Sequence, residues 1–98
     1  RTVDVYMILV GADAEKEGMR LAEKMRDEID NLKLQVNCGA GSFKSQFKKA
    51  DKSGAEYALI IADDEVSRGE VSLKPLRSGQ EQQNMSQPEV IKLIKESI

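Results

Sequence analysis

The chain has 98 residues, of which 40% are hydrophobic and 33% charged, and its formal net charge is −2. This length suits one domain with a modest core (residues 1–98), and this composition excludes a disordered tail. With no histidine and only one cysteine, Cys38, the sequence excludes a Ser-His or Cys-His nucleophilic pair, an internal disulfide and a zinc site with the usual ligands.

The start of the chain bears on its origin and compartment. It opens with Arg1 in place of methionine and enters a strand pattern almost at once, so we expect a domain cut from a longer protein; removal of a tag would leave the same start. No signal-peptide pattern is present, and the longest apolar run, 5–10, is far shorter than the ~20 residues that span a bilayer. A lone cysteine makes the reducing cytoplasm the expected compartment.

The first half of the chain alternates strands with helices. Residues 3–10 are almost uniformly apolar, as in a strand covered on both faces. Asp13 is placed to cap a helix from Ala14 to about Ile29, where apolar residues recur at three- and four-residue steps. Residues 32–38 alternate between apolar and polar, so we expect a strand at the edge of the sheet.

A glycine loop and a basic helix follow. Gly39 and Gly41 allow a sharp turn, and Ser42 is placed to cap the helix. Phe43 and Phe47 share one helical face and are more typical of core than of base-stacking residues. The ionisable residues of the helix are Lys44, Lys48, Lys49, Asp51 and Lys52. A helix with this positive balance in an acidic chain indicates that a polyanion binds here, and a merely solvated face is the alternative.

Two ligand motifs in the sequence are incomplete. The loop begins like a dinucleotide fingerprint, but Lys44 occupies the place of the third glycine, and no Gly-Lys-Ser/Thr follows. The helix N terminus can still donate N–H groups to a phosphate or a base edge. The acidic run 63–65 lacks the further oxygen ligands of a magnesium site, so a solvated turn is the better interpretation.

The second half predicts a change of strand direction. Residues 57–62 form a second buried strand, and the helical connections make the first three strands parallel. The segment 63–70 is too short for a helical crossover and predicts a turn, so strand 71–76 returns antiparallel. Pro75 places that strand at an edge or marks its end. Residues 80–85 predict a short polar strand.

The chain closes with a helix, and the elements together define the fold class. Residues 86–89 read Ser-Gln-Pro-Glu, a capping box with proline in the first turn, and apolar residues recur after it. The expected fold is α/β, with a mixed, mostly parallel five-stranded sheet flanked by three helices.

An ordered set of segments resembles the C-terminal anticodon-binding domain of class II aminoacyl-tRNA synthetases, and within that family the bacterial histidyl type. These segments are Phe43–Ala55, the apolar strand that follows, Glu65-Val66, Val71–Lys74 and Gly79–Gln82. A lysine-rich Gln-Phe-Lys-Lys-Ala-Asp-Lys run and a late Glu-Gln recur there in this order. The resemblance covers nearly the whole chain and implies that family's three-layer fold.

The resemblance implies that the domain recognises an anticodon loop, that of tRNA(His) for the histidyl type. In the family, contacts come from the loop before the second helix, an acidic residue after the third strand and a basic residue in the fourth. Those places are occupied here by Gly41, Ser42, Phe43 and Lys44, by Glu65, and by Lys74. A carboxylate accepts from guanine N1–H and N2–H, and an ammonium donates to O6 or phosphate. Lys48, Lys49 and Arg77 are then implied to hold the RNA backbone. Ala40 stands where some members have glycine, which affects the expected loop shape.

The resemblance also implies what these residues do not carry. No cofactor is expected in this domain, because ATP and Mg²⁺ belong to a catalytic domain whose arginine motifs have no counterpart here. The intact parent would be a cytoplasmic, homodimeric histidine–tRNA ligase, with no DNA or membrane partner. Three alternatives stay open: a non-charging paralogue or regulator of the same fold, a threonyl-, prolyl- or glycyl-type parent, and a small domain that dimerises or binds a phosphate metabolite.

Overall fold

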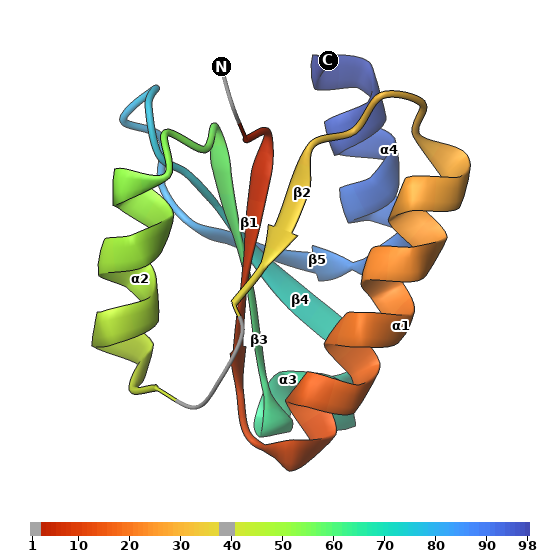
Figure 1. Cartoon of the computed structure of the whole chain (residues 1–98). Helices are drawn as coiled ribbons and strands as arrows, with labels where there is room; N and C mark the ends of the chain where they lie inside the picture. Colours follow the sequence, from red (N-terminus) through yellow and green to blue (C-terminus); the bar gives the residue numbers. More distant parts are fainter. Residues whose placement is uncertain (1–2, 38–40) are drawn as a thin grey trace.

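A five-stranded mixed sheet forms the middle layer of the fold (Figure 1). The computed structural model describes residues 3–37 and 41–98. Its elements are β1 (Val5–Val10), α1 (Ala12–Glu28), β2 (Leu34–Val36), α2 (Phe43–Lys52), β3 (Tyr57–Ala62), α3 (Asp63–Arg68), β4 (Glu70–Pro75), β5 (Gln83–Ser86) and α4 (Gln87–Ser97). The strand order is β2-β1-β3-β4-β5, with β1 parallel to β2 and β3, and β4 antiparallel to β3 and β5. The predicted parallel first half and antiparallel return are confirmed.

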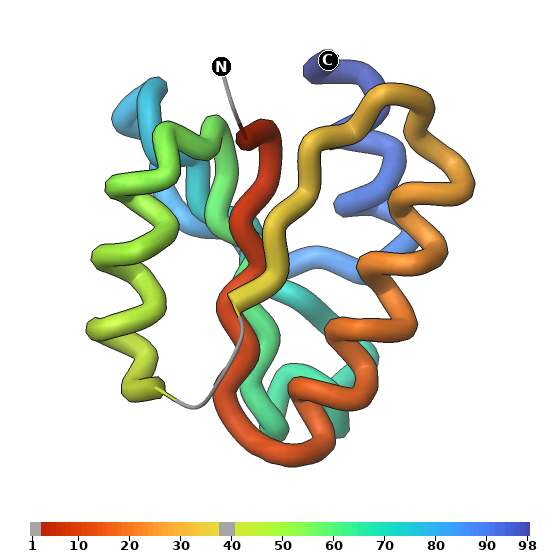
Figure 2. The backbone as a smooth tube through the Cα atoms, in the orientation of Figure 1, coloured from red at the N-terminus to blue at the C-terminus, as the bar shows by residue number. Residues whose placement is uncertain are grey.

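The helices cover the two faces of the sheet unequally (Figures 1 and 2). Helices α1 and α4 lie on one face and α2 on the other. The first face holds the thick core: Val5, Met7, Leu9, Ala14, Leu21, Ala22, Met25, Ile29, Leu59, Ile61, Val71, Leu73, Val90, Ile91 and Ile94. The second holds the thin core: Val3, Tyr6, Ile8, Ala50, Ala55, Ala58 and Ile60. Helix α2 packs against β1, whereas α4 packs against β4 and β5. Among the residues that the structure describes, no helix therefore covers the α2 face of β4 and β5.

The described residues contain a fourth helix where the sequence predicted only a turn. Three acidic residues fill the first turn of α3, where carboxylates favour the positive end of the helix dipole. Glu65 accepts a hydrogen bond from the Ala62 N–H at 3.0 Å, and Gly69 ends the helix with φ 68°. The helix is six residues long, too short for apolar periodicity to reveal it. The expected count of three helices is therefore wrong by this one.

The start of α1 also differs from expectation. The N-cap of α1 is Gly11, with φ 112°, and glycine has no side chain that could accept a hydrogen bond from the first turn. Instead the Ala14 N–H donates to Asp63 Oδ1 at 2.9 Å, so the first turn of α1 is capped by the first residue of α3. A Cβ on Gly11 would lie 2.2 Å from that oxygen, so the contact requires glycine. The predicted cap, Asp13, lies inside the first turn.

The remaining elements are present as predicted, but the bounds of the edge strands differ: β5 is Gln83–Ser86, where the sequence predicted 80–85. β2 is at the edge, as predicted, but has three residues, Leu34–Val36, and Cys38 lies outside the described residues. Pro75 is the last residue of β4, which lies between two strands, so the proline marks a strand end and not an edge. The capping box is confirmed: Ser86 Oγ accepts from the Glu89 N–H, and Glu89 Oε1 accepts from the Ser86 N–H at 2.9 Å. Within the described ranges, no helix has the length and apolar character needed to cross a bilayer.

Candidate functional site

Helix α2 begins at the end of the sheet where β1 and β3 finish, and α3 begins at that same end (Figure 1). Ser42 caps α2 as predicted, because its Oγ accepts from the Ser45 N–H at 3.1 Å. All four residues predicted to contact a base in this loop, Gly41 to Lys44, are exposed. The structure therefore presents the start of α2 to solvent, at the same end of the sheet as the start of α3.

An aromatic pair occupies the first turn and a half of α2. The rings of Phe43 and Phe47 are stacked, with centroids 5.8 Å apart and planes at 28°. Phe47 packs against the thin core, whereas Phe43 is 45% exposed. The core prediction is thus wrong for Phe43. An exposed ring face of this kind can stack with an unpaired base.

Four lysines run along the outside of α2 and form what we call the lysine stripe: Lys44, Lys48, Lys49 and Lys52. All four are exposed, and within residues 3–37 and 41–98 none of them makes an ion pair. Asp51, the one acidic residue of α2, is paired with Arg77 at 3.3 Å. The positive charge of the stripe is therefore not compensated by the nearby chain, which favours a polyanionic ligand.

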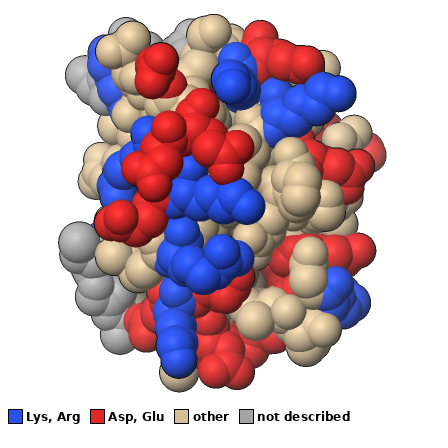
Figure 3. Space-filling model, turned by 90° about the vertical axis from the view of Figure 1, so that its right-hand side faces the viewer, with Lys and Arg blue, Asp and Glu red and all other residues tan. Residues whose placement is uncertain are grey.

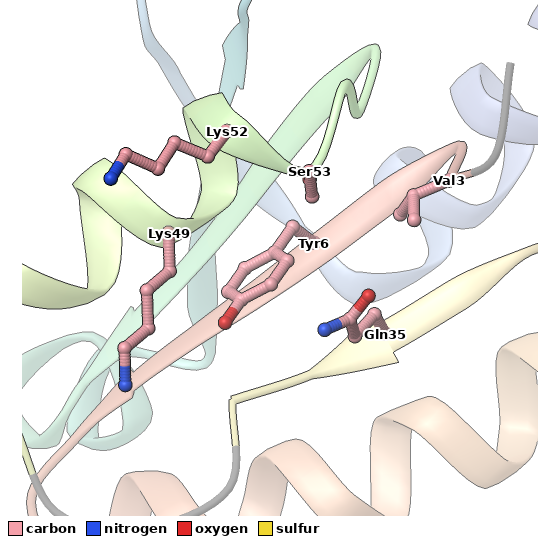
Figure 4. Close-up of a pocket in the computed structure, with 6 residues that line it drawn as sticks. All are labelled: Val3, Tyr6, Gln35, Lys49, Lys52 and Ser53. Atoms are coloured by element: carbon pink, nitrogen blue, oxygen red, sulfur yellow. The ribbon is translucent and has the colours of Figure 1, made fainter.

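The surface beside the lysine stripe is hollowed on both sides. One open hollow of ≈ 450 Å³ follows the stripe from Ser42 to Lys52. A second, of ≈ 540 Å³, lies between α2 and the β1–β2 strands, and Lys49 and Tyr6 are among the residues that line it (Figure 4). By contrast, acidic and basic side chains intermingle on the α1–α4 side of the molecule (Figure 3). The ion pair between Arg20 and Glu17 on α1 is an example.

Glu65, the predicted base-reading carboxylate, is buried and held within the chain. Its side chain accepts from the Ala62 N–H at 3.0 Å and from the Ser72 hydroxyl. Ser72 Oγ also lies 2.6 Å from the Asn84 amide. The Ser72 hydroxyl has one proton, which it donates to Glu65. The contact with Asn84 is therefore a hydrogen bond when the NH₂ group of that amide faces Ser72 Oγ and donates to it. The cluster joins α3, β4 and β5, and a base-reading role for Glu65 stays a prediction.

Asp63, Asp64 and Glu65 are the residues considered for magnesium, and Asp64 is paired with Arg68 at 3.0 Å. Asp63 accepts from the Ala14 N–H and Glu65 from the Ala62 N–H, so both carboxylates serve helix starts. In the part of the chain that the structure describes, no group of three His, Cys, Asp or Glu side chains is arranged to hold a metal ion.

Lys74 and Arg77 lie at the opposite end of the sheet from the α2 loop. Lys74 pairs in register with Ala58, the second residue of β3, whereas Glu65 follows the last residue of that strand. Arg77 donates to the carbonyl oxygens of Asp51 at 2.7 Å and Ala55 at 3.2 Å, so it fastens the C-terminal end of α2. The structure therefore brings Gly41–Lys44 and Glu65 to one end of the sheet but not Lys74 and Arg77, whose RNA contacts stay predictions.

Gln46 is the residue that the sequence analysis missed. It is 2% exposed, and its amide makes three hydrogen bonds to the backbone of Leu9 and Gly41. The only signal in the sequence was a polar residue next to Phe47 on the face where apolar residues were expected.

Comparison with known proteins adds a family and a fold. Residues 4–97 match the family model described as an anticodon binding domain. A histidine–tRNA ligase from Hydrogenovibrio crunogenus is 43% identical over 95 residues, which are 97% of this chain and 22% of that protein. This chain therefore spans less than a quarter of the length of that curated relative.

Solved structures of synthetases share the fold. An apo histidyl-tRNA synthetase from S. aureus superposes with TM-score 0.82 at 21% identity, over 96% of this chain and 23% of that one. A histidyl-tRNA synthetase from Nostoc sp. PCC 7120 superposes with TM-score 0.84 at 23% identity, over 100% of this chain and 22% of that one. The RNA binding domain of threonyl-tRNA synthetase from Cryptosporidium parvum Iowa II superposes with TM-score 0.87 at 9% identity, over 97% of this chain and 23% of that one. The predicted three-layer α/β fold is confirmed.

Proposed function

This chain belongs to the anticodon binding domain family, and from that premise we propose that it recognises the anticodon loop of tRNA(His) within a histidine–tRNA ligase. The histidine assignment is supported by the 43% identity to a histidine–tRNA ligase over 97% of the chain. The observation that carries RNA binding is the lysine stripe, which is uncompensated in a chain of net charge −2 and leads to an exposed aromatic ring.

In this proposal the start of α2 divides the work between bases and phosphates. A single-stranded loop exposes base faces and edges, so an unpaired base stacks on Phe43. The N–H groups at the capped helix start, together with Lys44, donate to a base edge or a phosphate. Lys48 and Lys49, one turn further along α2, neutralise phosphates without reading sequence. In this proposal the start of α2 determines which base is recognised, and the lysine stripe attracts the RNA and positions its backbone.

The predicted contacts away from the α2 loop carry conditions of their own. To read a guanine edge, Glu65 would exchange its bond to Ser72 for bonds to the base. For Lys74 and Arg77 to contact the same RNA, the RNA strand would have to run along the α2 face of the sheet toward the end near Ala58. The helix-free α2 face of β4 and β5 provides that path.

The rest of the proposed parent would supply the chemistry. Aminoacylation, with ATP and Mg²⁺, would take place in a separate catalytic domain, whereas these 98 residues contribute recognition alone. We place the parent in the cytoplasm as a homodimer, with neither DNA nor a membrane as partner. Charging of tRNA(His) by the intact protein, with histidine and ATP, distinguishes a ligase from a paralogue that only binds.

The decisive experiment compares two RNA hairpins of identical stem, one with the histidine anticodon and one with a changed anticodon. Affinities of the 98-residue chain for both are measured at one fixed salt concentration. We expect a preference of about 1–3 kcal/mol for the histidine anticodon per altered base. Equal affinities would reduce the proposal to non-specific RNA binding, and no binding would refute it.

A further inference from the structure

Strand β1 has an edge that β2 leaves unfilled. The register of the two strands ends at Met7 opposite Val36, and the Asn37 N–H donates to the Met7 carbonyl at 3.2 Å. In a parallel pair, alternate residues of a strand bond to the same neighbour, so Leu9 is the next residue whose backbone faces this edge. No residue of β2 lies opposite it.

The side chain of Gln46 makes the hydrogen bonds that a residue of a neighbouring strand would make with Leu9. Its Oε1 accepts from the Leu9 N–H at 3.1 Å, and its Nε2 donates to the Leu9 carbonyl at 2.8 Å. These are the donor and the acceptor that a neighbouring strand would have satisfied. Burial of the amide makes the arrangement demanding, because an unpaired buried polar group is costly.

A third bond links the same amide to the loop. Nε2 also donates to the Gly41 carbonyl at 3.0 Å, so both of its protons are used. Gly41 immediately precedes Ser42, the cap of α2, and Phe43 follows. One buried amide therefore fixes the loop against the backbone of β1.

We propose that Gln46 is a positioning residue that holds the segment Gly41–Lys44, at the start of α2, in the geometry needed to read a base; this inference rests on the proposed function. Only a primary amide of this length offers one acceptor and two donors here. Stacking and base-edge bonds depend on the position of the loop, whereas attraction between lysines and phosphates tolerates displacement. Loss of the amide therefore reduces discrimination between anticodons more than it reduces general affinity for RNA.

The test uses Gln46→Met, which removes all three bonds, and Gln46→Glu, which removes both donors and sets a carboxylate against two carbonyls. Gln80→Glu is the matched control, since it makes the same charge change in an exposed loop beyond β4. Dissociation constants for the two hairpins are measured under conditions where urea titration shows each variant folded. We expect the cognate constant to rise about tenfold, the changed-anticodon constant to move by less than about twofold, and the salt slope to stay unchanged.

The outcomes separate this inference from the proposed function. If the wild-type chain does not distinguish the hairpins, the proposed function fails, and this inference fails with it. If the wild type discriminates and the folded variants discriminate equally well, only the role of Gln46 is overturned. The same holds if both hairpins weaken equally.

A measurement on the wild-type chain keeps the inference testable even if both variants unfold. Amide hydrogen exchange should show the Leu9 N–H as protected as its neighbours in β1, and more protected when the cognate hairpin is bound. Free exchange at Leu9, or protection that the hairpin leaves unchanged, would overturn the role of Gln46.

Discussion

The two faces of the sheet show how this fold separates stability from recognition. Among the described residues, 15 buried side chains form the thick core under α1 and α4, and 7 form the thin core under α2. The outside of the thick side carries intermingled charges, whereas the lysine stripe and Phe43 lie on the thin side (Figures 1 and 3). A face that need not be fully covered by a helix can offer backbone, ring and ammonium groups to a ligand. The comparison teaches that the thin side is where binding is to be sought.

The largest expected effect comes from two neighbouring isoleucines that face opposite sides. Ile61 points into the thick core and Ile60 into the thin one, both nearly fully buried. Truncation to alanine should cost about 2–5 kcal/mol of unfolding free energy, with Ile61→Ala near the top of that range and Ile60→Ala near the bottom. Chemical denaturation of both variants measures the difference. Equal losses would contradict the unequal division of the core, and losses under ~1 kcal/mol would contradict burial of β3.

Next in size is Glu65→Gln, on the thin side. The amide brings an NH₂ donor to a site where two donors already point, so unfolding free energy should fall by about 1–3 kcal/mol. If Glu65 also reads a guanine, the folded variant should lose a similar amount of cognate affinity and none for the changed anticodon. Glu81→Gln, in an exposed loop, is the control. Lost stability with unaltered binding would assign Glu65 to the fold alone.

Phe43→Ala sharpens the comparison within one helix. Its ring is half-exposed, so its removal should lower stability by less than about 1 kcal/mol, mainly through the lost stacking on Phe47. Affinity for the hairpin should fall by about 1–3 kcal/mol if a base stacks there. Phe47→Ala should instead lower stability more than it lowers affinity for the hairpin, because that ring packs on the thin core. Calorimetry and hairpin titration of both variants check this.

Replacement of two lysines on each side tests the charge asymmetry. Lys48→Ala with Lys49→Ala should weaken both hairpins about equally and flatten the salt slope by roughly 0.7 per lost phosphate contact. The control pair, Lys92→Ala with Lys95→Ala on α4, removes the same charge from the other side. A double-logarithmic plot of affinity against salt gives the slopes. The stripe would lose its proposed role if the two double variants behaved alike.

The smallest effect concerns the pH dependence of the thick side. The pKa of Glu89 lies below its ordinary value. The main cause is the hydrogen bond that its carboxylate accepts from the Ser86 N–H, and a hydrogen bond with the Ser86 hydroxyl is the second. A depressed folded pKa contributes stability above the unfolded pKa, and this stability is lost as pH falls through the folded value. The advantage of the wild type over Glu89→Ala in urea should therefore shrink below about pH 5. A constant advantage down to about pH 3 would contradict it.

The sequence predicted elements whose stabilisation is local or strongly patterned. β3 was predicted with its observed bounds, 57–62, because its whole length is apolar, and the capping box at 86–89 is a contact within four residues. The exposed ring of Phe43 was missed, because periodicity places Phe43 and Phe47 on the same helical face and does not show which of the two rings is covered.

Contacts between distant segments escaped prediction. Gln46 finds Leu9 at a separation of 37 residues and Asp63 finds Ala14 at 49, so no window of sequence contains both partners. Helix α3 is held by Glu65 through a bond to Ser72 on the following strand. The candidate site inherits this limit: its charges were visible in the sequence, whereas the amide that fixes its loop was not.

The bond between Asp63 and the start of α1 has a consequence for the order in which the chain assembles during synthesis. Helix α1 is synthesised before α3, and the carboxylate that caps its first turn belongs to a residue made 49 positions after Ala14. Until β3 has docked beside β1, the exposed N–H groups of that turn have no partner from α3, and we expect the turn to fray. Helix α1 is thus completed by the first residue of α3, and docking of β3 beside β1 is the event that brings this residue into place.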